Sequence, residues 1–439
     1  MGFLQHSSLT ILTRWGGYVL EGVASIVVAR YTGPSGKGML AVLNVIGGLA
    51  VQMGNFGLHA ATTHFAAREA GSLARIAWAS LVLAPTIGLV IAGGLGGLIL
   101  LFPAVVAGVP PILVAVTLVA IPFAFLLLFF QNILLGQQRI AAYNLLEVGG
   151  KALTLPLVLA ILVVLGGGVR ELVLAGSLVS VVTALTAVRL AFRGVSEPFL
   201  LDRGLLRRML AYGFRSYLSC LLAYLIIRSD MLLVNYFLGT GQAGVYAVAV
   251  NLSDLLLVFP TAIGAMLFPR ISAQPKDDGA LTAAACRHTA AGMLILCLGA
   301  GLLARPLILL LYGRPFSGAI APFLLLLPGI LALSLETIFM NDLAGRGLPP
   351  IVIAVPGAGL ALNLALNLAF IPRFGILAAA ASSSLAYGVM LAIAWRAFAR
   401  RTAIPATACG VLTVTDVKAL CQRLQPVRLA GEVTRDARQ

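Results

Sequence analysis

Apolar stretches long enough to cross a membrane recur along the whole chain of 439 residues. A helix needs about 20 mostly apolar residues to span the hydrocarbon core of a bilayer. Gly- and Pro-rich segments such as YTGPSGKG, LGTGQAG and GRGLPP separate the stretches. The pattern predicts twelve spans, at residues 10–29, 41–63, 76–101, 111–133, 143–165, 171–190, 211–238, 243–268, 289–311, 319–343, 350–371 and 374–396. We therefore expect an all-α polytopic membrane protein.

Composition supports this interpretation, because 60% of the residues are hydrophobic and only 10% are charged. Soluble chains contain about 25% charged residues. The first apolar stretch lacks a basic leader and contains Arg14 and Glu21, so we interpret it as a retained helix rather than a signal peptide. The five cysteines form no C-x-x-C motif, and neither a metal site nor a cofactor is expected.

The sequence contains no recognisable catalytic motif. GPSGKG at 33–38 departs from the phosphate-binding loop pattern, which needs Gly where Thr32 stands and Ser or Thr where Gly38 stands. The longest loops have about 20 residues, which is too short for a catalytic domain outside the membrane. We do not expect an enzyme.

Loop charge predicts the orientation of the chain. With the amino terminus inside, the cytoplasmic loops and the start of the tail hold fifteen basic residues, whereas the opposite loops hold five, namely Arg30, Lys37, Arg170, Arg314 and Arg373. Positive charge concentrates on the cytoplasmic side of membrane proteins. Both termini are therefore expected in the cytoplasm, and the net charge of +15 is a topology signal rather than a sign of nucleic-acid binding.

Two halves of six helices are expected. The largest interior polar segment follows the sixth span, which predicts a first lobe at 1–192, a cytoplasmic linker at 193–209, a second lobe at 210–397 and a basic cytoplasmic tail at 398–439. Within the linker, LLDRGLLRRML is interpreted as a short amphipathic helix at the membrane surface. YTGPSGKGMLAV aligns with FLGTGQAGVYAV without gaps, with Gly33 over Gly239. Repeats in one orientation imply halves related by an axis along the membrane normal.

Ionisable residues inside the spans are the candidate functional groups, because a charge in hydrocarbon is costly and usually faces a cavity or the bundle interior. Arg14, Tyr18 and Glu21 share one face of the first helix. In the seventh, Tyr224 and Arg228 share a face with Tyr217, and Asp230 lies nearby. For Arg228, an aqueous cavity and a structural ion pair both remain open.

Other charges have simpler alternatives. Glu147 and Lys151, four residues apart, could neutralise each other. Arg215 and Asp342 lie near helix ends and could reach the interface. Asp254 and Glu336 lie deeper in the eighth and tenth spans.

The segment RSDMLLVNYFLGTGQAGVYAVAVNLSDLLLVFPTAIGAMLFPRIS (228–272) resembles helices seven and eight of bacterial polysaccharide or O-antigen flippases. The matching pieces are Asp230, FLG (237–239), GVY (244–246) and FPRIS (268–272). ARYTGPSGKGMLAV and GQQRIAAYN are similar to further parts of that family, which belongs to the multidrug/oligosaccharidyl-lipid/polysaccharide exporter superfamily.

The resemblance implies a V of two six-helix lobes around a central cavity, in the bacterial cytoplasmic (inner) membrane. It implies flipping of undecaprenyl-diphosphate-linked oligosaccharide for lipopolysaccharide, O-antigen or exopolysaccharide synthesis, by alternating access. Arg14, Arg228, Arg215 and Lys151 would then bind the diphosphate, and Tyr18 and Tyr224 the sugars. Glu21, Asp230, Asp254 and Glu336 would couple transport to protons or sodium. The alternative is a cation-coupled multidrug and toxin extruder of the same superfamily, which needs a net acidic, aromatic cavity.

Overall fold

The computed structural model describes residues 2–68, 73–193, 198–199, 202–273, 279–347, 350–402 and 404, without the side chains of residues 2–15, 18, 215 and 216. Every regular element within these ranges is helical, so the predicted all-α fold is confirmed. The elements are α1 (Gly2–Gly54), α2 (Leu58–Arg68), α3 (Leu73–Leu101), η2 (Pro103–Val106), α4 (Pro111–Gly136), α5 (Ile140–Leu159), η3 (Ala160–Val164), α6 (Val169–Phe192), α7 (Arg203–Ala273), α8 (Ala280–Leu311), η4 (Arg314–Ala319), α9 (Ile320–Gly345), α10 (Ile351–Phe374) and α11 (Ile376–Thr402).

Ten helical segments of the described residues are long and apolar enough to cross a membrane. Two of these, in α1 and α7, each contain a single non-helical residue, Gly33 with φ 66° and Gly239 with φ 76°. Both glycines occupy positive φ, a region that side chains with a Cβ rarely adopt. Each long helix therefore reverses at its glycine, which gives the twelve predicted crossings. Loops were expected there, but Pro34 begins the next helix directly, since proline is favoured at a first helical position.

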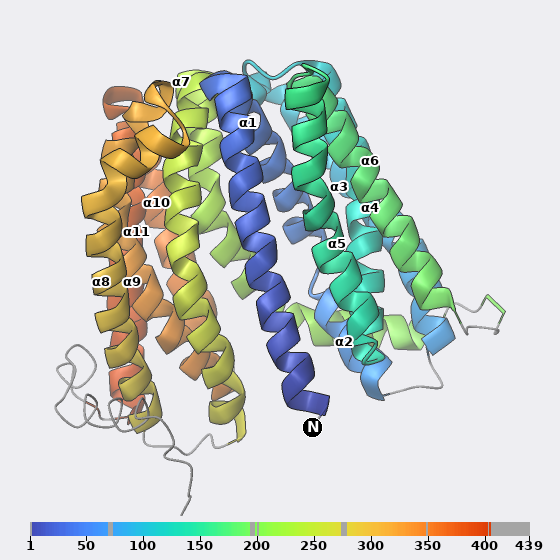
Figure 1. Cartoon of the computed structure of the whole chain (residues 1–439). Helices are drawn as coiled ribbons and strands as arrows, with labels where there is room; N and C mark the ends of the chain where they lie inside the picture. Colours follow the sequence, from blue (N-terminus) through green and yellow to red (C-terminus); the bar gives the residue numbers. More distant parts are fainter. Residues whose placement is uncertain are drawn as a thin grey trace, which may run out of the picture.

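The helices form two lobes in a V (Figure 1). Helices α1–α6 make one arm and α7–α11 the other, and the arms converge at the end that holds Gly33 and Gly239. One buried apolar cluster joins both arms at this end and includes Val42 and Val248. Separate clusters fill each arm further away, around Phe129 in the first. The arms diverge toward the end that carries the amino terminus (Figure 1). The lobe boundaries at 192 and 210 stay predictions.

The second predicted span, 41–63, is interrupted by a short turn. Asn55 accepts the backbone N–H of Gly57 with its side-chain oxygen at 2.6 Å. A Cβ on Gly57 would lie 2.1 Å from the carbonyl oxygen of Gly213, so only glycine allows this approach between α2 and α7. An asparagine that bonds two residues ahead is a common way to turn a chain.

The predicted amphipathic helix is the first part of α7, and it packs on the first lobe. Leu205 and Met209 are buried in the cluster of that lobe. The ring of Tyr212 stacks on His64 of α2, with centroids 4.4 Å apart. Asp202 caps this segment by accepting the Leu205 backbone N–H at 3.0 Å, and Arg75 of α3 lies 3.1 Å from its other carboxylate oxygen. The segment 203–212 is therefore held by the first lobe, although the chain continues into the second.

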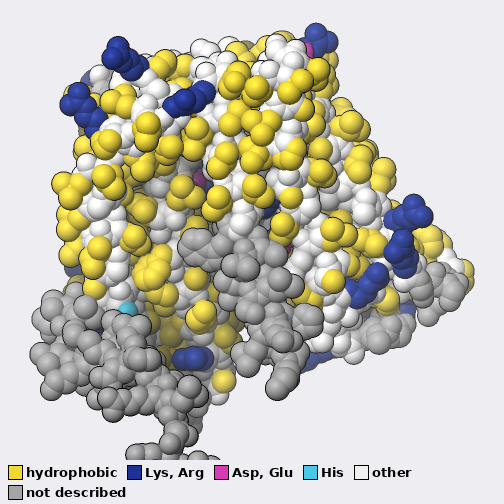
Figure 2. Space-filling model, viewed as in Figure 1, with side chains coloured by type: hydrophobic (Ala, Val, Ile, Leu, Met, Phe, Trp, Pro, Cys, Tyr) yellow, Lys and Arg dark blue, Asp and Glu magenta, His cyan; other side chains and the backbone are white. Residues whose placement is uncertain are grey.

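The exterior matches a membrane environment. Figure 2 shows hydrophobic side chains over the middle of the visible face and Lys and Arg at its two ends. Large apolar side chains are solvent-exposed in the isolated chain, for example Leu100 and Leu302, each 84% exposed. Such a belt suits lipid rather than water.

Candidate functional site

A cavity of about 980 Å³ lies between the two lobes. Its walls come from α1, α4, α5, α6 and α7, and Tyr312 at the end of α8 closes one side. Most of its polar lining is uncharged and consists of Ser25, Asn44, Gln131, Thr154, Ser180, Thr183, Tyr224, Asn251 and Tyr312. Hydroxyl and amide groups of this kind bind neutral polar ligands such as sugars by hydrogen bonds.

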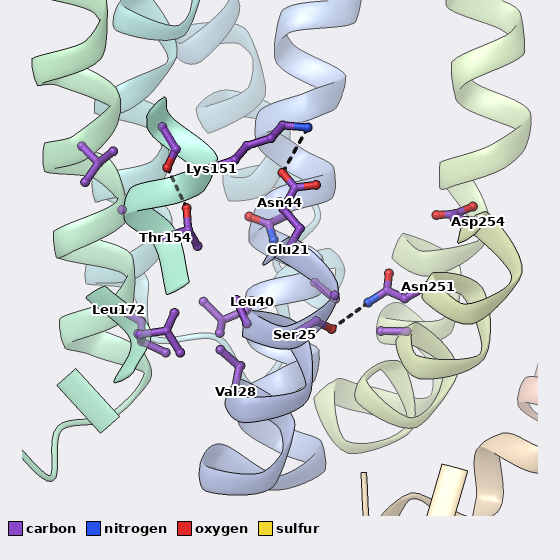
Figure 3. Close-up of a pocket in the computed structure, with 18 of the residues that line it drawn as sticks. Glu21, Ser25, Val28, Leu40, Asn44, Lys151, Thr154, Leu172, Asn251 and Asp254 are labelled. Carbon is purple, nitrogen blue, oxygen red and sulfur yellow. Dashed lines mark hydrogen bonds and ion pairs between the residues drawn. The ribbon is translucent and has the colours of Figure 1, made fainter. Parts of the chain in front are cut away.

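Two ion pairs stand in the cavity wall. Lys151 of α5 lies 3.4 Å from Glu21 of α1, and Arg228 lies 2.9 Å from Asp254 across the two crossings of α7. Figure 3 shows Glu21 on α1 with Lys151 facing it from α5, and Asp254 on the opposite side of the cavity. All four side chains are between 29% and 47% exposed, so the pairs remain open to solvent or ligand.

The formal charges of the cavity wall balance. Lys37, Lys151 and Arg228 face Glu21, Glu147 and Asp254. Arg228 lines the cavity and also forms an ion pair with Asp254, so the two hypotheses made for it from the sequence are compatible. Lys151 pairs with Glu21 of another helix, and the neutralisation of Lys151 by Glu147 stays a prediction. Any anion that binds at Arg228 or Lys151 competes with a carboxylate.

Asp230 lies outside this cavity, buried in the second lobe. Its carboxylate accepts the hydroxyl of Tyr246 at 2.5 Å, its neighbour's backbone N–H at 2.7 Å and the hydroxyl of Ser383 at 3.3 Å. Asn363 donates to Ser383 at 3.2 Å, and Asn367 donates to Asn363 at 2.9 Å. This network joins α7, α10 and α11. Asp230 therefore does not partner Arg228 at close range.

Of the other residues predicted for the site, one lies in the cavity wall and one lies outside it. Tyr224 lines the cavity. Glu336 of α9 is 5% exposed and is not among the residues that line it. The side chains of Arg14, Tyr18 and Arg215 lie outside those that the structure describes. Their assignment to the substrate stays a prediction.

Lys37 was missed as a site residue. The sequence placed it in an outer loop, but the helix restarts right after Gly33 and carries Lys37 into the cavity wall. It is 8% exposed and donates to the hydroxyl of Ser25 at 2.6 Å. The Asn251 amide lies 3.4 Å from the same hydroxyl. The proline after Gly33 was the available signal, because proline suits the first turn of a helix.

The family of the chain follows from a match to a family model described as "Polysaccharide biosynthesis protein", which covers residues 3–274. The match includes most of the cavity wall described above. The chain belongs to this family. The family expected from the sequence is thereby confirmed.

Two curated relatives of this chain are archaeal. It is 30% identical over 196 residues to a "Probable flippase AglR" of Haloferax volcanii, which is 41% of this chain and 40% of the relative. It is 28% identical over 205 residues to the "Uncharacterized membrane protein MJ1068" of Methanocaldococcus jannaschii, which is 44% of this chain and 39% of the relative. The chain thus spans about two fifths of the length of the curated relatives that it matches.

Solved structures share the fold. The inward closed conformation of the lipid II flippase MurJ matches with a TM-score of 0.76 at 13% identity, over 91% of this chain and 88% of that one. An inward-facing multidrug resistance MATE family transporter of the MOP superfamily matches with a TM-score of 0.72 at 16% identity, over 88% and 94%. At these identities the likeness establishes the two-lobe fold alone.

Proposed function

We propose that this polysaccharide biosynthesis family member is a flippase that moves a lipid-linked oligosaccharide across the cytoplasmic membrane by alternating access. The observation that carries the proposal is the cavity between the lobes, whose lining combines many hydroxyl and amide groups with three cations. The uncharged groups suit sugar hydroxyls, and arginine and lysine suit the phosphates of an undecaprenyl-diphosphate carrier.

The proposal includes an orientation with both termini in the cytoplasm. The distribution of basic residues among the loops supports it. The arms diverge at the end of the amino terminus (Figure 1), so this orientation makes the described state open toward the cytoplasm. The substrate would enter there with its headgroup between the arms and its lipid tail outside them.

Ion coupling is assigned to the carboxylates of the sequence prediction, with Asp230 foremost. Its network is buried and rich in oxygen atoms, and the side-chain oxygen of Asn367 within it has no hydrogen-bond partner. A buried network that ends at a carboxylate and contains an oxygen without a donor suits a proton or a small hard cation. Asp230→Asn is expected to abolish any dependence of transport on a proton or sodium gradient, whereas a mere packing role would leave that dependence intact.

The test is export of surface polysaccharide by cells that depend on this gene. Arg228→Ala is expected to abolish export while the protein still reaches the membrane, because it removes a cation from the cavity wall. Arg170→Ala, at an exposed position in the first turn of α6, is the matched control and should export normally. Normal export from Arg228→Ala would contradict the role of Arg228 in binding.

The alternative is extrusion of organic cations, and the aromatic lining of the cavity favours it. Tyr224 and Tyr312 line the cavity and could stack on a cationic ring, whereas the formal charges of the wall balance and are not net acidic. Accumulation of a fluorescent organic cation in cells that lack the gene, reversed by wild type, would support extrusion. Unchanged accumulation together with lost polysaccharide would support the flippase.

A further inference from the structure

Lys37 differs from the other cations of the cavity wall. Lys151 and Arg228 each have a carboxylate within ion-pair distance. Within the part of the chain that the structure describes, Lys37 has no such partner, and it donates a hydrogen bond to the neutral hydroxyl of Ser25 at 2.6 Å. It is also the most buried of the three, with 8% of its surface exposed.

The surroundings of Lys37 come from both lobes. Ser25 and Lys37 belong to the two crossings of α1, and the amide of Asn251 reaches Ser25 from the second crossing of α7 at 3.4 Å (Figure 3). The next residue, Gly38, lies against the backbone of Thr240, where the two lobes touch. The cluster therefore lies at the closed end of the cavity, where the arms of the V converge.

A buried ammonium without a counter-ion is costly, and the cost falls when an anion binds beside it. Lysine offers three donors, and the amide of Asn251 offers a second donor group in the same cluster. The hydroxyl of Ser25 can turn to donate or to accept. Together these groups suit the oxygens of a phosphate, and at this position an anion displaces no carboxylate.

We propose that Lys37, Ser25 and Asn251 form an anion subsite at the closed end of the cavity, which takes a phosphate group. This inference rests on the proposed function for the identity of the natural ligand, a lipid diphosphate. Free diphosphate has the same chemistry, and the experiment separates the two sources. Because the donors come from both lobes, a bound phosphate ties the lobes together at this end.

The test measures binding to the purified full-length protein in nanodiscs. The probes are farnesyl diphosphate, inorganic diphosphate and farnesol, and the readout is the change in melting temperature and in tryptophan fluorescence. Lys37→Met removes the charge and keeps the apolar stem, whereas Lys37→Arg keeps the charge. Arg170→Met makes the same loss of charge at an exposed position and is the matched control.

Wild type, Lys37→Arg and Arg170→Met are expected to bind farnesyl diphosphate with similar affinity, and Lys37→Met at least about tenfold more weakly, which is about 1.4 kcal/mol. Farnesol should bind all four proteins alike. If inorganic diphosphate binds in the same Lys37-dependent way, the phosphate alone is recognised. If only farnesyl diphosphate does, the lipid is part of the ligand. Both results support the subsite.

A second measurement uses wild type alone and does not depend on the folding of a variant. Reductive methylation of Lys37, followed by peptide mass spectrometry, is expected to slow when diphosphate or farnesyl diphosphate is present. Equal binding by Lys37→Met and wild type, or unprotected Lys37, overturns the subsite. Lys37-dependent binding without any movement of lipid-linked sugar in liposomes would overturn the proposed function and leave the subsite standing.

Discussion

Gly38 and Gly244 face each other's helix across the contact between the lobes. A Cβ on Gly38 would lie 1.8 Å from the carbonyl oxygen of Thr240, and a Cβ on Gly244 would lie 1.8 Å from that of Pro34. Gly38 and Gly244 are 206 residues apart in the sequence, as are Pro34 and Thr240, and as are Gly33 and Gly239. The two halves of the internal repeat thus meet in a symmetric contact, in which the positions of Gly38 and Gly244 have no room for a side chain.

Alanine at either glycine is expected to open this contact, because the obstacle is backbone, which cannot rotate away. Gly38→Ala and Gly244→Ala should both increase amide hydrogen exchange in residues 34–45 and 240–250. Gly47→Ala is the control, since a Cβ at Gly47 meets nothing within 4 Å. Protection in Gly38→Ala equal to that of the control would show that the lobes do not depend on this contact.

Exchanging the charges of Arg228 and Asp254 separates structure from binding. Each single change, Arg228→Asp or Asp254→Arg, replaces the ion pair by two like charges on facing crossings and should lower the melting temperature. The double variant restores an ion pair and should recover most of that loss. If Arg228 also contacts the substrate, export stays low in the double variant, because the arginine is then at position 254, on the second crossing of α7. Full recovery of export would assign the pair to stability alone.

Asp342 is expected to be a major contributor to stability. It is fully buried, accepts two bonds from Arg346, at 2.8 and 3.0 Å, and a third from Thr282 at 2.6 Å. It does not reach the interface as its position near a helix end had suggested. Asp342→Ala takes the carboxylate away from a buried guanidinium, a change that costs about 3 kcal/mol or more. Thermal melts in detergent should show the loss, with Arg346→Lys intermediate because it cannot form the two-pronged contact.

The cap at Asp202 predicts a dependence on acid. The backbone N–H of Leu205 lowers the pKa of Asp202 below its ordinary value of 3.8, and Arg75 adds to the effect. Because the folded pKa is lowered, the stabilisation is present above pH 3.8 and is lost as the pH falls through the folded pKa. Asp202→Asn keeps a capping side chain but removes the charge. Its melting temperature should lie below wild type at pH 6, and the difference should shrink toward pH 2. A difference of constant size would exclude the charge as its cause.

Much of the fold was predictable because hydrophobic length and punctuation specify helices one at a time. The twelve crossings and the two lobes could be predicted without knowing how the helices pack. The partners of the charged residues could not be predicted without that knowledge. Asp254 meets Arg228 only because α7 reverses at Gly239, and Glu21 meets Lys151 only because α1 lies beside α5.

Lys37 lies outside its expected loop, and Asp230 lies in a different environment from Arg228, each for a local reason. Lys37 stands in a glycine-rich segment that is typical of a loop, yet a single glycine makes the whole turn. Asp230 is two residues from Arg228, and residues at this spacing point to different helix faces. The face with Arg228 lines the cavity, and the face with Asp230 packs inside the second lobe. The two residues are therefore in different environments although they are close in sequence.

The packing of residues 203–212 on the first lobe determines how the lobes can move. The stack of Tyr212 on His64 and the backbone contact of Gly57 with Gly213 fix the start of α7 to α2. The rest of the helix belongs to the other arm. The first lobe thus holds the beginning of a helix whose remainder belongs to the second lobe, so a change in the angle between the lobes is expected to bend α7 near Gly213.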